Sequence, residues 1–187
     1  MKKEKEQQED YGLKLQESHD RWAHIYEYGC SGPFYPDGVN LDLVRNHISY
    51  YRRKIKETMT PENYPAAYFK EVPPKVDYNY IARPDEIRAA ARASLAAYKA
   101  DPNYQYIVRN SGDFTPKTRG KLYIDTVIGY ATGLERDIEN DDLLGMRRHK
   151  RDARYIELFE DCAHKMRETP PETVQFSLFS IEREVKA

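Results

Sequence analysis

Apolar residues recur at helical spacing over several separate stretches of the chain. The most regular series follows alternating steps of three and four residues: Leu41, Val44, Ile48, Tyr51 and Ile55. Such steps bring side chains onto one face of a helix, so they predict an amphipathic helix that Asn40 can cap. Residues 3–27 show helical spacing up to Gly29. Two helices are therefore expected in the first third of the chain.

Two stretches rich in glycine or proline border these helices. Residues 29–38 hold three glycines and two prolines, which predicts a tight loop, and we expect Phe34 and Tyr35 to fasten it to the core. Four prolines interrupt the tyrosine-rich residues 60–82, which leave room for one short helix near 62–70. Most of this second stretch is therefore predicted to run extended.

The second half of the chain reads as one helix after another. Pro84 opens an alanine-rich helix that runs to about Ala100, with two acids in its first turn. Residues 103–110 fit either a helical turn or a strand. Thr115 and Pro116 form a cap and first-turn pair for the next helix.

The helix after Pro116 carries an apolar face that continues to Ile138. Its glycines, at positions 120, 129 and 133, are expected to permit close helix crossing, since a glycine inside a helix is otherwise unfavourable. A last helix is predicted from Asp141 or Asp142 to about Glu168. Its later half is expected to bury four residues: Tyr155, Phe159, Cys162 and Met166.

These elements predict an all-α fold. With 187 residues, we expect a single compact domain of about five to six helices over residues 11–168, including the extended Pro/Tyr-rich segment. Residues 1–10 are expected to be a flexible N-terminus, and residues 169–187 a C-terminal tail that begins with prolines.

Composition narrows the class of protein. Charged residues make up 33% of the chain, yet 40% are hydrophobic, which is too many for a disordered protein. The formal net charge of -1 gives no global attraction to a polyanion. Two cysteines are too few for a disulfide framework, and no apolar run reaches the length of a membrane span. We therefore expect a cytoplasmic protein without a membrane partner.

No catalytic or metal-binding pattern stands out. Cys162 and His164 lie two residues apart, so a helix would point them to different faces. Cys30 has His24 and His47 within conceivable reach but fits no nucleophile signature, and a packed cysteine is the favoured interpretation. Glycine-rich nucleotide motifs are missing. We therefore expect a non-enzymatic protein without cofactor or metal, and an enzyme that uses Cys30 or a histidine is the least favoured alternative.

Basic residues gather in two clusters. The basic ridge on the helix after Asn40 consists of Arg45, Arg52, Arg53 and Lys56. The second basic cluster lies in the last predicted helix and consists of Arg147, Arg148, Lys150, Arg151 and Arg154. Because charged residues interrupt the apolar stripe there, the first half of that helix is expected to project past the core. Either cluster is a candidate for binding DNA, RNA or an acidic protein, and the alternative is a solvated face that pairs with nearby acids.

The tail contains a short recognition sequence, Gln175-Phe176-Ser177-Leu178-Phe179, after a proline-rich spacer. It resembles the pentapeptide that binds the bacterial sliding clamp, with phenylalanine at the second position where leucine is usual. The resemblance implies that Leu178 and Phe179 enter an apolar pocket while Gln175 supplies a hydrogen bond. The alternative is that this aromatic segment folds back onto the domain.

Residues 22–57, WAHIYEYGCSGPFYPDGVNLDLVRNHISYYRRKIKE, resemble small accessory proteins of bacteriophages and mobile elements. Together with the tail, this resemblance implies an accessory protein in DNA metabolism whose partner is the sliding clamp or a DNA-bound protein. The alternative is an inhibitor of a host defence nuclease, similar in size and class to anti-CRISPR proteins. Neither resemblance supplies a catalytic residue.

Overall fold

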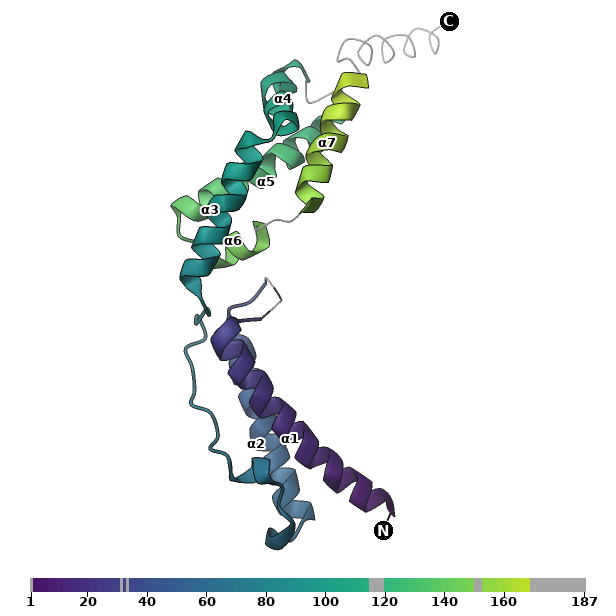
Figure 1. Ribbon diagram of the computed structural model, residues 1–187, viewed down its shortest axis with the longest axis vertical. Coiled ribbons are helices and arrows are strands. Elements are labelled where there is room, and N and C mark those ends of the chain that lie inside the picture. Colours follow the sequence, from purple (N-terminus) through teal and green to yellow (C-terminus); the bar gives the residue numbers. More distant parts are fainter. Residues whose placement is uncertain (1, 31, 33, 115–119, 150–152, 169–187) are drawn as a thin grey trace, which may run out of the picture. The chain divides into compact units, whose positions relative to one another are not determined.

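The computed structural model describes residues 2–30, 32, 34–114, 120–149 and 153–168 (Figure 1). Over these ranges the regular structure consists of seven α-helices and three short 3-10 helices, without a strand. The expected all-α class is confirmed. The range expected to form one domain contains two compact units, one ending at Pro84 and the other beginning at Asp85, and each has its own hydrophobic core.

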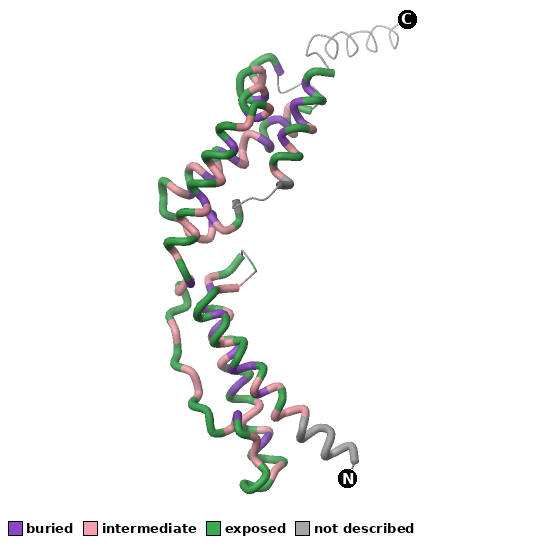
Figure 2. Tube along the Cα trace, in the orientation of Figure 1, coloured by how far each residue is buried: buried purple, intermediate pink, exposed green. Residues whose placement is uncertain are grey.

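The first unit is built on a helical hairpin. Helix α1 (Lys2–Tyr28) and helix α2 (Asp37–Thr58) run antiparallel (Figure 1). Helix α1 includes residues 2–10, which we had expected to be flexible. Figure 2 shows buried positions along both helices. Seven buried apolar residues form the hydrophobic core cluster of the unit: Leu15, Ile25, Leu41, Val44, Ile48, Ile55 and Ala67. The apolar face predicted for α2 is thus confirmed.

An extended segment returns along the hairpin. After the 3-10 helices η1 (Pro61–Asn63) and η2 (Ala66–Phe69), residues 70–83 run without regular structure, as predicted (Figure 1). We call residues 70–83 the return segment. Side chains of the hairpin satisfy part of its backbone: Arg45 Nε donates to the carbonyl of Pro73 at 3.0 Å, and Arg52 Nη1 donates to the carbonyl of Lys70 at 3.1 Å.

A buried carboxylate joins the return segment to the loop. Helix α2 begins at Asp37, not after Asn40, so the predicted Asn40 cap is wrong. The Asp37 side chain is fully buried and accepts the backbone N–H groups of Cys30 at 2.8 Å and Ala82 at 2.9 Å. Hydrogen bonding and the positive end of the α2 dipole together stabilise a charge that would otherwise be costly to bury.

Glycine allows the chain segments around Asp37 to approach closely. The N–H of Gly38 donates to the carbonyl of Tyr80 at 3.0 Å, and a Cβ at position 38 would collide with the carbonyl oxygen of Asp77. Gly29 ends α1 with φ +79°, a conformation that favours glycine. The junction of α1, α2 and the return segment therefore depends on the Asp37 carboxylate and on the two glycines.

The second unit packs five helices around a separate core. In chain order the elements are α3 (Pro84–Ala100), α4 (Pro102–Asn110), η3 (Ser111–Asp113), α5 (Lys121–Glu139), α6 (Leu143–His149) and α7 (Ala153–Glu168). Its most buried side chains include Tyr98, Ile107, Val127, Leu134, Met146, Phe159 and Cys162. Phe159, Cys162 and Met166 are buried as predicted, while Tyr155 is half-buried.

Local capping decides two helix starts in this unit. Residues 102–110 are helical because Asp101 Oδ1 accepts the N–H groups of Asn103 and Tyr104. Gly120 precedes α5 with φ +95°. The expectation that it lies inside the helix is therefore wrong. The predicted cap pair at positions 115 and 116 lies outside the described residues.

The last predicted helix is described as two helices, α6 and α7. Asp141 has φ +52° in the turn before α6, and Asp142 accepts the N–H of Gly145 in the first turn of α6. Met146 is only 1% exposed, so α6 enters the core. For residues 143–148 the expectation that this half projects past the core is wrong, because an apolar side of α6 packs on α5 beside its charged residues.

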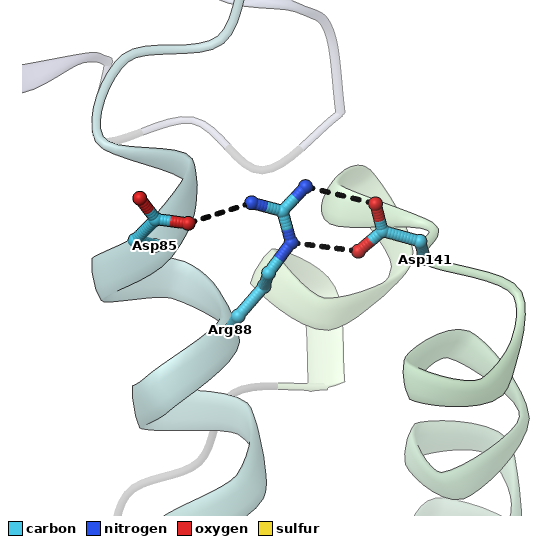
Figure 3. A network of polar contacts seen from close by, with 3 residues as sticks. All are labelled: Asp85, Arg88 and Asp141. Atoms are coloured by element: carbon cyan, nitrogen blue, oxygen red, sulfur yellow. Dashed lines mark hydrogen bonds and ion pairs between the residues drawn. The ribbon is translucent and has the colours of Figure 1, made fainter.

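An arginine links the start of α3 to the turn between α5 and α6 (Figure 3). Arg88 donates to both carboxylate oxygens of Asp141 at 2.8 Å and to Asp85 at 2.8 Å. The guanidinium holds the pKa of the Asp141 carboxyl below its usual value. Because these groups are partly exposed, the contact contributes to geometry more than to stability.

Replacing Asp37 by asparagine is expected to destabilise the first unit by about 2–4 kcal/mol, since the amide would set an NH₂ group against a buried N–H donor. Urea unfolding followed by the fluorescence of Trp22, the single tryptophan, measures this. Asp42→Asn is the control, because Asp42 on the same helix accepts from the exposed hydroxyl of Tyr78. Equal unfolding midpoints for both variants would contradict the role of Asp37.

Two glycines of the second unit should respond in opposite directions to alanine. At Gly145 a Cβ would collide with the carboxyl of Asp137, so Gly145→Ala should destabilise the unit by about 1–3 kcal/mol. At Gly129, inside α5, a Cβ would meet no atom within 4 Å, so Gly129→Ala should stabilise it by about 0.5–1 kcal/mol. Thermal unfolding followed by circular dichroism tests both signs. The expectation that Gly129 permits a close helix crossing is therefore wrong.

Candidate binding site

A pocket of about 340 Å³ lies beside the loop that joins α1 to α2. We call it the loop-end pocket. Its lining residues come from α1, the loop and the first turns of α2: Arg21, His24, Ile25, Gly29, Cys30, Gly32, Phe34, Tyr35 and Asn40. All of them belong to the first unit, so one folded unit builds the pocket by itself.

Two neighbouring aromatic rings of the loop face solvent. Phe34 is 71% exposed and Tyr35 is 65% exposed, so the expectation that they fasten the loop to the core is wrong. The physical reason is that Asp37 and the glycines already fasten the loop through backbone contacts. Large exposed aromatic side chains next to a pocket are typical of binding surfaces.

Polar side chains of the pocket supply hydrogen-bond donors. Arg21 and His24 are exposed on the same side of α1, and Asn40 adds an amide from α2. No carboxylate is among the residues that line this pocket. The pocket therefore suits a ligand that combines a flat or apolar body with an anionic or carbonyl oxygen.

Stacked rings hold the last turns of α1 in place. Trp22 and Tyr26 stack at 5.0 Å between ring centroids, and Tyr26 stacks on Tyr80 of the return segment at 5.2 Å. The guanidinium of Arg83 lies 4.3 Å from the ring centre of Tyr28. These contacts give the α1 side of the pocket a defined geometry.

The structure places two of the four residues of the basic ridge against the return segment. Arg45 and Arg52 donate to its backbone carbonyls, and Arg52 also lies over the ring of Tyr68 at 5.0 Å. Arg53 is exposed and 3.8 Å from Glu57, while Lys56 is exposed on the surface of α2. Arg45 and Arg52 thus have a structural role, and nucleic-acid binding by the ridge stays a prediction.

The other predicted binding residues are only partly described. Arg147 and Arg148 lie on α6, and Arg148 is 3.8 Å from Asp142. Lys150 and Arg151 lie outside the described residues, as does the side chain of Arg154. The tail motif, residues 175–179, also lies outside them.

The structure brings Cys30 and His24 to the lining of the same pocket, whereas Cys162 lies in the core of the other unit. Cys30 is half-buried beside the pocket, and Cys162 is fully buried in the second core. Burial raises the pKa of the Cys162 thiol to about 11, so this thiol is protonated at neutral pH. Among the described residues, no group of three or more histidine, cysteine, aspartate or glutamate side chains is placed to hold a metal ion.

Sequence reasoning did not assign Arg21 or Asn40 to a site, and it considered His24 only as a possible partner of Cys30. The available signals were two adjacent aromatic residues inside a Gly/Pro-rich loop and a polar pair three positions apart on the preceding helix. In the described ranges, no helix combines the length and apolar composition needed to cross a bilayer. Comparisons with protein-family models, curated proteins and solved structures give no match, so function is inferred from the residues of this chain.

A buried histidine lies under the opposite end of the return segment. His19 is 8% exposed, and its Nε2 has no hydrogen-bond partner among the described residues. Burial lowers the pKa of His19, and the nearby cations Lys70 and Arg52 lower it further, against the opposing effect of Asp20. The folded unit therefore favours the neutral form of His19.

This histidine should make the stability of the first unit depend on pH. The unfolded chain binds a proton at His19 below about pH 6.5, whereas the folded unit resists it, so stability is full above that pH and falls as the pH decreases toward the lowered pKa. Urea unfolding of the full chain at several pH values, followed by Trp22 fluorescence, measures the slope. His19→Gln should flatten it, whereas His47→Gln, an exposed control on α2, should leave it unchanged.

Proposed function

We propose that this chain is a non-enzymatic accessory protein of DNA metabolism, encoded by a bacteriophage or mobile element, that acts by binding. In this proposal, Gln175–Phe179 attach the protein to the bacterial sliding clamp. The loop-end pocket holds a second partner at the DNA. The two binding elements lie at different places in the chain, so one protein would bridge two molecules.

The observation that supports this proposal most strongly is the exposed pair Phe34 and Tyr35 beside Arg21. Aromatic side chains and arginine are the residues that carry most of the binding energy in interfaces. The helix that carries Arg21 is fixed by the ring stack and by the buried Asp37 junction. A fixed frame lowers the conformational entropy lost on binding.

A second candidate is an inhibitor of a host defence nuclease. The feature that favours it is the position of the loop-end pocket on a folded unit, where binding would not require the tail. Such an inhibitor would hold its target through the first unit and block the nucleic-acid channel of the nuclease. The two candidates therefore differ in which part of the chain is needed.

Substituting Leu178 and Phe179 by alanine is expected to weaken binding to a purified bacterial sliding clamp at least tenfold, because both anchors would leave an apolar pocket. Surface plasmon resonance with the full chain measures this. The matched control carries alanine at Val174 and Ile181, apolar residues just outside the motif. Clamp tethering is refuted if the anchor variant binds as tightly as that control.

A pull-down from bacterial lysate separates the two candidates. Full-length protein is compared with a chain ending at Thr173 and with the Phe34→Ala/Tyr35→Ala variant, and captured proteins are identified by mass spectrometry. Clamp recovered by the full-length protein but lost on truncation supports the accessory protein. A nuclease recovered by both lengths, and lost in the aromatic variant, supports the inhibitor instead.

A further inference from the structure

We propose that the loop-end pocket binds single-stranded DNA, with unpaired bases stacked on Phe34 and Tyr35 and the backbone phosphates contacted by Arg21. This inference rests on the proposed function only in its choice of the same pocket. It names the ligand class, which the proposed function leaves open.

The two rings differ from the other exposed aromatic side chains of the unit. Phe69 is also 71% exposed, but its ring packs against Tyr64 and Tyr68. Among the described residues, neither Phe34 nor Tyr35 has a ring or cation partner. Stacking of a base on an aromatic side chain contributes about 1–3 kcal/mol per base, whatever the base. Two adjacent unpartnered rings therefore suit a short run of bases.

The charge beside these rings is uncompensated. Arg53 and Arg88 each have a carboxylate partner, whereas Arg21 has no ion pair within the part of the chain that the structure describes. The adjacent carboxylate of Asp20 accepts from Gln16 and lies 3.9 Å from Lys70. An exposed guanidinium without a carboxylate partner favours a phosphate ligand.

The size of the pocket favours a single strand. A volume of about 340 Å³ is near the lower end for small-ligand sites, which suits one planar base. In a duplex the base faces are already stacked on each other and cannot reach a ring. Asn40 adds an amide that offers both a donor and an acceptor to a base edge.

Fluorescence anisotropy with a labelled oligothymidine of about 15 nucleotides tests this inference on the full chain. The wild type should bind the single strand more tightly than a duplex of equal length. Phe34→Ala/Tyr35→Ala should weaken binding at least tenfold, while Phe69→Ala, a ring of equal exposure, should bind like the wild type. Arg21→Gln should weaken binding and lower the salt slope by about one, whereas Arg92→Gln, at an exposed arginine of α3, should leave both unchanged.

The inference is overturned if the wild type does not bind the oligonucleotide, if duplex binds as well, or if Phe69→Ala loses as much as the paired variant. Unchanged thermal unfolding of each variant shows that a loss is not caused by misfolding. Failure of this inference is distinct from failure of the proposed function. If the wild type does not bind DNA, the inference that the pocket binds single-stranded DNA is removed. The proposed function is kept in that case if the Phe34→Ala/Tyr35→Ala variant still loses a protein partner in the pull-down.

Discussion

The first unit depends on one buried carboxylate. Asp37 accepts two backbone N–H groups that come from the loop and from the return segment, and it does so from the first turn of α2. Three segments of the chain thus share one hydrogen-bonding centre. Gly38 lets the return segment pass close to the helix start, so the chain needs no strand pairing to fasten it. Without this centre, the loop would have to be held by its aromatic side chains.

That division of roles explains why the candidate site lies where it does. Because backbone contacts fasten the loop, Phe34 and Tyr35 stay exposed beside Arg21. Conversely, Arg45 and Arg52, which look like binding residues in the sequence, satisfy carbonyls of a segment that has no regular structure. These carbonyls bond to side chains because the return segment has no regular structure that would supply backbone partners. In this unit, two arginine side chains hold the backbone in place, whereas two aromatic side chains of the loop remain exposed.

The second unit also relies on acidic side chains and glycine at helix starts. Asp101 caps α4, and Asp142 caps the first turn of α6 next to Gly145, which leaves room for the carboxyl of Asp137. The positive φ of Asp141 turns the chain there, and its carboxylate receives Arg88 from α3. Short acidic side chains thus set where α4 and α6 start, while apolar periodicity decides which face of a helix is buried.

The sequence by itself determined the all-α class, the buried face of α2, the extended course of residues 70–83 and the core side of α7, because apolar periodicity and proline act over neighbouring residues. Only the tertiary structure decided which charges are buried, which arginines hold the backbone and which rings remain exposed. Asp37 and Arg45 acquire their roles from residues of the return segment that lie 45 and 28 positions away along the chain. Contacts at that separation leave no periodic trace in the sequence, so they become visible only when the chain is folded.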